Sequence, residues 1–417
     1  MENNSIEEGD NNREVSPALI AVHPLDKFIA VAIGSDLRIF DTTEDCAISL
    51  LDDSGGSLHS DSIRAIRFGA NGRLFVSAGD DKLVKLWTTS PWNCMRTVSS
   101  EKRVSAVAIS QDGLFVCYAD KFGVVWVVST DGNSDVASPI FAHYCSIITS
   151  LEFSPDGRFI VSADRDFKIR VTLFPQKPFS GAHEIQSFCL GHTEFVTCLT
   201  FVNPPEEPQG FLLSGSGDAT VRMWDIKSGS LVDTCEVGLE AGLLESNGNE
   251  ETLSPAVTDI RATPDGSIIA VAIQGLHGVV LLSCDFPSRT LSITKVVTMK
   301  ESFSPTSLGM GISPERLWMV TGASNLPNSE SSSFTRIRVI TGLIGSPVVL
   351  EDSVIPGGLK LLEKLQGSVS CDKGEAALAA AAEAVKTAMR NLLIKRQYSV
   401  EKRELRKKSR NDKKLKG

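Results

Sequence analysis

The feature that most constrains the fold of this chain is an internal repeat. Three segments align on their turn residues, and in each a histidine precedes an alternating apolar run, a turn, a second apolar run ending in serine, a turn carrying aspartate, and a third run. They read HSDSIRAIRFGANGRLFVSAGDDKLVKLW (59–87), HYCSIITSLEFSPDGRFIVSADRDFKIRVT (143–172) and HTEFVTCLTFVNPPEEPQGFLLSGSGDATVRMWD (192–225). A fourth copy without the histidine covers 103–127, and three degenerate copies cover 18–41, 257–282 and 305–340.

The spacing of these copies predicts a ring of small sheets. Measured at the residue that closes each third run, successive steps are 47, 39, 46, 52, 58 and 58 residues. Steps of roughly 40–45 residues are typical of propeller blades, and the longer steps contain polar insertions at 204–209, 236–254 and 324–335. Short apolar runs bounded by Asn-Gly or Asp-Gly favour strands joined by tight hairpins. We therefore predict an all-β, seven-bladed β-propeller over 16–355.

The two ends of the chain have different compositions from the repeats. We predict a disordered acidic N-terminus (1–15), a linker and alanine-rich helix (356–394), and a disordered basic tail (395–417). From residue 386 onward, 13 Lys/Arg stand against 3 Asp/Glu, a local balance of +10, so the rest of this chain of net charge −9 carries −19. The tail could contact phosphates, whereas the acidic body cannot attract nucleic acid by bulk charge.

Cysteine usage and apolar run lengths indicate the compartment. The nine cysteines form no CxxC pair and mostly lie in apolar runs, as expected of buried thiols in a reducing compartment. Metal ligands do not cluster in the sequence, so we expect no metal site. The polar, acidic opening does not read as a signal peptide, and no apolar run approaches the length of a membrane span. We expect an intracellular soluble protein without membrane contact.

The recurring polar residues of the repeats have two interpretations. Taken singly, a serine, a histidine and an aspartate suggest a hydrolase. The same set recurs in several blades, however, and an active site does not repeat around a ring. We therefore predict structural tetrads and no catalytic residue, and no glycine-rich turn opens a helix that could bind a nucleotide or S-adenosylmethionine in this chain. The tetrads are His59, Ser77, Asp81 and Trp87 in blade two, and His192, Ser214, Asp218 and Trp224 in blade five.

The turn of the fourth blade carries more charge than a hairpin needs. It reads SADRDFKIR over Ser162–Arg170. A structural role accounts for one aspartate, Asp166, which aligns with Asp218. Arginine and an aromatic residue exposed together are typical of interfaces. The sequence leaves open whether this is a partner site or an ordinary solvated turn.

Two segments of this region resemble a known family. The strings ADRD-x-KIR (163–170) and IxSFCLGHTEFV (185–196) are similar to those of the WD-repeat non-catalytic subunit of tRNA (guanine-N7)-methyltransferase. The resemblance implies a heterodimer in which a separate Rossmann-like subunit binds S-adenosylmethionine and methylates N7 of a guanosine in the tRNA variable loop. The WD-repeat subunit is then expected to stabilise that enzyme and help to place the tRNA, without a cofactor of its own. By resemblance, the candidate docking residues are Asp164, Arg165, Asp166, Lys168 and Arg170.

The basic tail has three interpretations: a solubilising segment, a nuclear-localisation signal, or an arm that contacts tRNA phosphates. We expect a nuclear signal and a tRNA arm together, with the nucleus as the main location and the cytoplasm as a second one. An alternative function is a generic WD-repeat scaffold, such as a ubiquitin-ligase substrate receptor or a chromatin-complex subunit, which would need no basic tail. The candidate tRNA-contacting residues are Lys395, Arg396, Lys402, Arg403, Arg406, Lys407 and Lys408.

Overall fold

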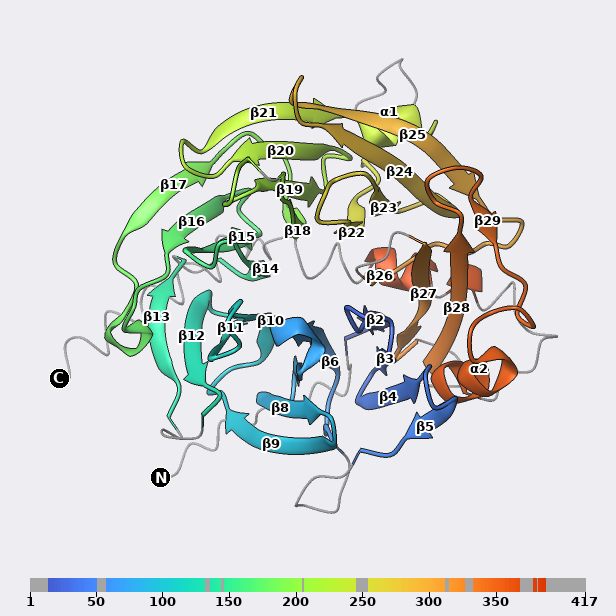
Figure 1. Ribbon diagram of the computed structural model, residues 1–417, viewed down its shortest axis with the longest axis horizontal. Helices are drawn as coiled ribbons and strands as arrows, with labels where there is room; N and C mark the ends of the chain where they lie inside the picture. The colour runs from blue at the N-terminus through green and yellow to red at the C-terminus, as the bar shows by residue number, and fades with distance from the viewer. Residues whose placement is uncertain are drawn as a thin grey trace, which may run out of the picture.

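The structure is a computed structural model in which small antiparallel sheets stand side by side around a central axis (Figure 1). Seven sheets occur among the described residues, which confirms the predicted seven-bladed β-propeller. The described residues are 14–50, 58–131, 136–143, 146–204, 206–244, 254–311, 315–326, 333–367, 378–380 and 382–387.

Six blades each consist of four strands that follow one another in the chain. The blades are, in order, β2 (Leu19–Val22), β3 (Phe28–Ile33), β4 (Asp36–Asp41) and β5 (Cys46–Ile48); β6 (Ile63–Gly69), β7 (Leu74–Gly79), β8 (Leu83–Thr89) and β9 (Trp92–Ser99); β10 (Val104–Ile109), β11 (Phe115–Asp120), β12 (Val124–Ser129) and β13 (Ser138–Ala142); β14 (Ile148–Phe153), β15 (Phe159–Asp164), β16 (Ile169–Leu173) and β17 (Ile185–Cys189); β18 (Val196–Val202), β19 (Phe211–Ser216), β20 (Val221–Asp225) and β21 (Ser230–Cys235); and β22 (Val257–Ala262), β23 (Ile269–Ile273), β24 (Gly278–Asp285) and β25 (Thr290–Thr298).

The antiparallel order gives the ring two distinct faces. Turns between the second and third strands of a blade, and connections from one blade to the next, lie together on what we call the upper face. Turns between the first and second strands, and between the third and fourth, lie on the lower face. The first strand of each blade lines the central channel, and the fourth forms the outer edge (Figure 1).

The middle strands are apolar because neighbouring blades cover both of their sides. Every residue of β3, β15 and β19 is buried, and their sequences are FIAVAI, FIVSAD and FLLSGS. The hairpins between the first and second strands use the glycines expected from the sequence: Gly113 and Gly157 have φ angles of 75° and 70°. Only a residue without Cβ adopts this conformation at no steric cost, so the local sequence favours the turn that the fold requires.

The ring closes through the chain's first strand. Blade seven contains β26 (Ser307–Met310), β27 (Arg316–Ser324), β28 (Ser333–Thr341) and β29 (Val348–Val349). The short strand β1 (Ser16–Pro17) pairs antiparallel with the end of β27, with Ser16 opposite Ser324 and Pro17 opposite Ala323. Residues from the two ends of the propeller therefore share one sheet, and blade one follows directly beside it.

Hydroxyl side chains at one position of the inner strands join neighbouring blades. Ser105, Thr149, Thr258 and Thr306 each donate a hydrogen bond to a carbonyl oxygen at the start of the next inner strand, at 2.7, 2.6, 3.1 and 2.7 Å. The channel that these strands surround has a volume of about 150 Å³. Each of these bonds runs from one blade to the next, so the hydroxyl row holds the blades together at the axis.

A helix covers the outer edge between blades seven and one. Helix α2 (Gly358–Gln366) lies beside β4, β5 and β28 (Figure 1) and buries Leu361, Leu362 and Leu365. Arg38 Nη1 donates to the Leu365 carbonyl oxygen at 3.1 Å, and Gln366 Oε1 accepts from the backbone amide of Ile337 at 2.8 Å. This stretch lies in the region predicted as a linker before the alanine-rich helix, although its leucines recur at helical spacing.

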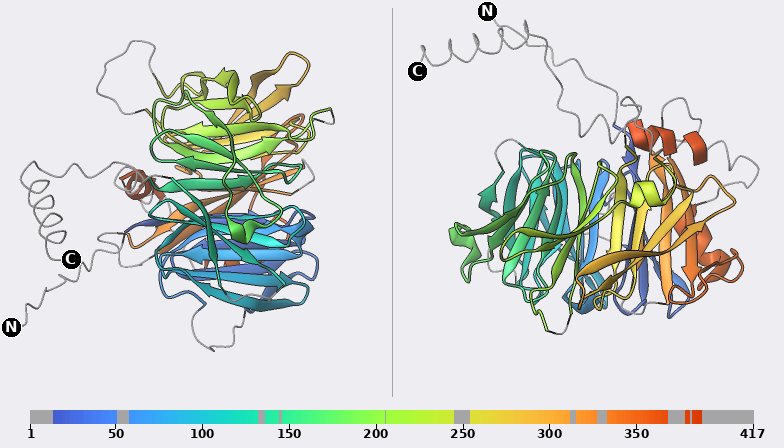
Figure 2. Two further views of the ribbon diagram at one scale, coloured as in Figure 1. Left: turned by 90° about the vertical axis from the view of Figure 1, so that its left-hand side faces the viewer. Right: turned by 90° about the horizontal axis from the view of Figure 1, so that it is seen from above.

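Three shorter segments complete the described chain. The insertion at 236–254 begins with helix α1 (Val237–Glu240), and two 3₁₀ turns cover Ala70–Gly72 and Pro178–Ser180. Residues 378–380 and 382–387 are helical, within the predicted alanine-rich helix, and bury Leu378 and Val385. Leu378 packs on Phe334 at the start of β28, and Figure 2 shows this segment in red on one face of the ring. None of the described helices is long and apolar enough to cross a bilayer.

Candidate partner-binding site

The predicted tetrad of blade five is assembled around one serine hydroxyl. His192 Nε2 lies 2.7 Å from Ser214 Oγ, and Trp224 Nε1 donates to the same oxygen at 2.8 Å. The other ring nitrogen, His192 Nδ1, lies 2.8 Å from Asp218 Oδ2. Burial alone would raise the pKa of Asp218, but hydrogen bonds from His192 and Thr220 lower that pKa to about 2. The carboxylate is therefore ionised and fixed on the histidine ring.

Blade two repeats this arrangement. His59 Nδ1 lies 2.7 Å from Asp81 Oδ2 and His59 Nε2 lies 2.9 Å from Ser77 Oγ, while Trp87 Nε1 donates to Ser77 at 3.2 Å. Ser77, like its counterpart in blade five, is completely buried. A substrate cannot reach either hydroxyl, so both sets act as strand connectors rather than as nucleophiles.

Blade four uses a different aspartate from the one that the alignment indicated. His143 Nε2 lies 2.8 Å from Ser162 Oγ, but His143 Nδ1 lies 2.8 Å from Asp164 and not from Asp166, the residue aligned with Asp218. The connection before β14 is longer: four residues lie between His143 and Ile148, against three between the histidine and the first strand in blades two and five. The structural aspartate of this blade is therefore Asp164, which corrects the role assigned to Asp166.

Asp164 consequently differs from the other candidate docking residues. Its side chain is 2 % exposed, and its second carboxylate oxygen accepts from the backbone amides of Asp166 and Lys168 at 2.8 and 3.1 Å. Asp120 does the same in blade three, where it accepts from the amides of Phe122 and Val124 at 2.8 and 3.1 Å. In both blades a buried carboxylate shapes the turn and leaves the following residues to face outward.

The remaining candidates lie together at the upper end of blade four. Lys168 is exposed, and Arg165, Asp166 and Arg170 are half-buried. Arg165 Nε is buried without a hydrogen-bond partner in the described chain. No carboxylate among the described residues lies within ion-pair distance of Arg165, Lys168 or Arg170. The turn therefore presents positive charge that the described part of the propeller does not neutralise.

Arg170 is held against the neighbouring blade. Its guanidinium lies over the Phe141 ring of β13 at 4.7 Å, and Nη1 donates to the Ala142 carbonyl oxygen at 3.2 Å. Its Nε donates to Thr172, which occupies the position of the tetrad tryptophan. Burial lowers the pKa of Arg170. This arginine links blades three and four while keeping part of its side chain at the surface.

Two aromatic side chains that the candidate set did not include lie on the same face. Phe167 is 40 % exposed in the turn of blade four, and Phe122 is 59 % exposed in the corresponding turn of blade three. Phe167 has a φ angle of 68°, a left-handed conformation that is strained for a bulky residue. Lys102 lies 5.2 Å from the centre of the Phe122 ring. The turns align Phe122 with Asp166 and not with Phe167, so the alignment gave no signal for Phe122.

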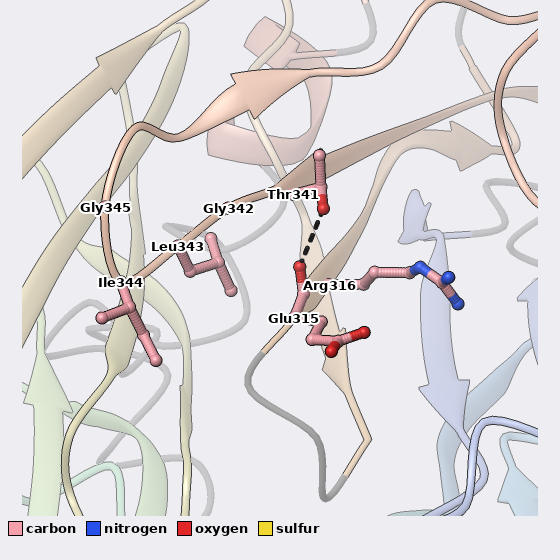
Figure 3. A pocket seen from close by; sticks show the side chains of 7 residues that line it. All are labelled: Glu315, Arg316, Thr341, Gly342, Leu343, Ile344 and Gly345. Atoms are coloured by element: carbon pink, nitrogen blue, oxygen red, sulfur yellow. Dashed lines mark hydrogen bonds between the residues drawn. The ribbon is translucent and has the colours of Figure 1, made fainter.

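Other parts of the surface offer less chemistry. A shallow depression of about 270 Å³ lies on the lower side of blade seven (Figure 3), where Thr341 Oγ1 donates to the Glu315 carbonyl oxygen at 3.1 Å. Its other lining residues are Arg316 and 342–345. Nowhere in the described stretches do three His, Cys, Asp or Glu side chains gather as metal ligands. The candidate tRNA-contacting residues 395–408 lie outside the described residues.

Comparison with protein families identifies the middle of the chain. Residues 133–308 match the family described as the tRNA methyltransferase TRM82 WD40 domain, and residues 56–88 match the WD domain, G-beta repeat. The second match covers most of blade two, and the first covers blades four to six with the end of blade three.

Individual relatives carry the same description. A Xenopus laevis protein named tRNA (guanine-N(7)-)-methyltransferase non-catalytic subunit is 31 % identical, over 75 % of this chain and 77 % of that protein. Proteins of that name from Danio rerio and Dictyostelium discoideum are 34 % and 28 % identical, over 64 % and 65 % of this chain. The chain spans 61 % and 59 % of the length of these two relatives.

Solved structures agree on the architecture. Those titled "Structure of U3-55K" and "Crystal structure of RRP9 WD40 repeats" both superpose with a TM-score of 0.60, at 19 % and 18 % identity. The first comparison covers 74 % of this chain and 88 % of the other, and the second covers 74 % and 87 %. At this level of identity, the likeness concerns the propeller fold alone.

Proposed function

Because the chain belongs to the family of WD-repeat non-catalytic subunits of tRNA (guanine-N7)-methyltransferase, we propose that it binds and stabilises a separate catalytic methyltransferase. The pair is a heterodimer that forms N7-methylguanosine in the tRNA variable loop. S-adenosylmethionine binds to the catalytic partner, and this chain acts as a non-enzymatic scaffold. The candidate serine hydroxyls support this assignment, since both are closed off inside their blades.

The observation that carries the proposal is the uncompensated charge on the upper face of blade four. Arg165 and Lys168 have no carboxylate partner in the described chain and flank the exposed ring of Phe167. Arginine and aromatic residues dominate the energetics of interfaces, and a cationic surface selects an acidic counterpart. The turn is therefore the docking surface of this chain, and it binds an acidic patch of the catalytic subunit. Asp164 fixes the backbone of the turn from inside the blade.

The tail completes the proposal. Lysine and arginine over 395–408 would contact tRNA phosphates once the catalytic subunit has placed the tRNA, adding affinity but little sequence specificity. The same residues serve as a nuclear signal, so the complex acts in the nucleus and the chain also reaches the cytoplasm. Removing 395–417 should weaken tRNA binding by the complex and make it less dependent on salt, while the two subunits stay associated.

The test of the docking surface is charge reversal. Lys168→Glu and Arg165→Glu should weaken binding of the catalytic subunit about tenfold or more each, since they place like charges at the interface. Calorimetry with the purified partner measures the change, and thermal melting of the isolated chain checks its fold. Lys227→Glu is the matched control, because Lys227 is also exposed but lies in the lower-face turn between β20 and β21.

Three outcomes separate the alternatives. Loss of the partner with an unchanged melting temperature supports docking at this turn, whereas loss of folding assigns the turn a structural role. Normal binding by both reversed variants contradicts the proposed surface.

A pull-down followed by mass spectrometry and a methyl-transfer assay tests the identity of the partner. Recovery of ubiquitin-ligase or chromatin proteins without a methyltransferase would instead support the scaffold alternative.

A further inference from the structure

A cluster of three cations on the upper face surrounds one carboxylate from the start of the described chain. Glu14 Oε2 lies 3.2 Å from Lys121 Nζ, 3.8 Å from Arg64 Nη2 and 3.8 Å from Arg103 Nη1. Lys121 belongs to the upper turn of blade three, next to the proposed docking turn of blade four. We refer to Arg64, Arg103 and Lys121 as the basic notch.

The basic notch contains more positive charge than its buried carboxylate, Asp80, neutralises. Asp80 is the second carboxylate here; its side chain is 3 % exposed, and its Oδ2 accepts from Arg64 Nε at 2.7 Å. Lys121 Nζ lies 3.9 Å from the other oxygen of Asp80. Arg103 has an ion pair with Glu14 and with no other described carboxylate. Without Glu14, the notch holds three cations against one buried carboxylate.

Glu14 is the exchangeable member of this cluster. Its side chain is 50 % exposed, whereas those of Arg64 and Lys121 are 13 % and 21 % exposed. Burial would raise the pKa of Glu14, but Lys121 and the two arginines lower it, so the carboxylate is held as an anion. Half-exposed ion pairs are weak, because water solvates the separated charges nearly as well.

The backbone next to Glu14 has its own anchors. Asn325 Nδ2 donates to the Glu14 carbonyl oxygen at 3.2 Å, and β1 begins two residues later in the sheet of blade seven. The side chain of Glu14 can therefore leave the notch while β1 keeps the ring closed. The exposed ring of Phe122, adjacent to Lys121 in the chain, offers an apolar contact to a protein ligand at the same place.

We propose that Glu14 is a built-in competitor, which fills the basic notch in the free chain and is displaced by a carboxylate from the acidic surface of the partner. The inference rests on the proposed function for the identity of that partner. It deepens the proposal by adding a second contact point, in blade three, to the turn of blade four. Glu14 also lowers the affinity of the free chain for its partner, because the partner has to break the contacts of Glu14 before forming its own.

The experiment uses the full chain and a fluorescent hexaglutamate peptide as probe, followed by anisotropy at low salt. Glu14→Gln should bind the peptide about two- to fivefold more tightly than the unmodified chain, the change expected for one exposed ion pair. Adding Lys121→Gln should remove this gain, and salt should reduce it. Glu44→Gln is the control: it removes the same charge from an exposed lower-face turn, between β4 and β5, and should leave binding unchanged.

Other outcomes would overturn the inference. Equal peptide affinity of Glu14→Gln and the unmodified chain, or a gain that survives Lys121→Gln, would show that Glu14 does not compete at the notch. A gain for oligouridylate but not for hexaglutamate would assign the notch to phosphate instead.

Titration with the catalytic methyltransferase then separates the two proposals. The same order of affinities with that subunit supports both. If hexaglutamate binds the variants with the expected order of affinities and the methyltransferase binds none of them, competition by Glu14 at the notch is supported and the proposed function fails. If the methyltransferase binds all variants equally and the peptide shows no gain, the proposed function stands and the competition is refuted.

Discussion

Replacing His192 by alanine tests whether the buried polar sets stabilise the propeller. The change removes one contact to an ionised carboxylate, 2.8 Å from Asp218, and one to a hydroxyl, 2.7 Å from Ser214. A hydrogen bond to a charged group contributes about 1.5–3 kcal/mol and a neutral one about 0.5–1.5 kcal/mol. The two together amount to about 2–4.5 kcal/mol, and the cavity left by the 6 % exposed side chain places the expected loss in the upper part of that range.

Thermal unfolding followed by calorimetry measures this loss. With an unfolding entropy of about 2.1 cal/mol/K per residue, a propeller of roughly 340 residues loses about 4 °C of melting temperature for about 3 kcal/mol. His183→Ala is the matched control, since that ring is exposed and, among the described residues, its side chain has one hydrogen bond, to the Ser180 carbonyl oxygen at 3.1 Å. Its melting temperature should change by less than about 1 °C.

Equal shifts in the two variants would refute the reasoning. They would mean that the buried ring contributes no more than a surface histidine, so that packing alone holds blade five together. A loss of partner binding by His192→Ala, with its melting temperature unchanged, would contradict the structural role more directly and indicate a functional one.

Three further predictions follow from particular side chains. The folded-state pKa of Asp218, about 2, lies below its usual 3.8, so its contribution to stability is complete above about pH 4 and is lost as the pH falls towards 2; Asp218→Asn should flatten the melting temperature over that range. Leu361→Ala should destabilise the seam under α2 by about 2–5 kcal/mol, whereas Leu359→Ala, at a 70 % exposed position, should change stability by less than about 0.5 kcal/mol in denaturant unfolding. Phe167→Gly should relieve about 1 kcal/mol of left-handed strain and raise the melting temperature slightly, while calorimetry shows weaker binding of the catalytic subunit.

The propeller could be predicted because its determinants are local. Short apolar runs and glycine turns recur at blade-length spacing, and each copy encodes one sheet that needs its neighbours. Ring closure left no comparable signal. The pairing of Ser16 with Ser324 involves a two-residue strand and spans almost the whole propeller, so neither periodicity nor turn chemistry indicates it. The same holds for Glu14, whose partners Arg64 and Lys121 belong to two other blades.

The candidate site shows a subtler limit. The sequence identified the turn of blade four by its charge, but an alignment compares columns and assigns the structural role to Asp166. One additional residue between His143 and β14 transfers that role to Asp164. The alignment cannot show this change of partner. The histidine and the aspartate lie on different segments, and the pairing of the strands decides which aspartate lies beside the histidine.

That shift bears on the proposal that one hairpin serves both folding and binding. In blade five the aspartate that holds the histidine, Asp218, lies within the turn itself, so this turn residue has a structural role. In blade four Asp164 sits at the end of β15 and fixes the backbone of Asp166 and Lys168 from below. The residues that follow Asp164 are thereby held in one conformation, which includes the left-handed φ of Phe167. A preorganised turn loses little entropy on binding, so the proposed docking surface predicts that the buried carboxylate of Asp164 raises partner affinity without touching the partner.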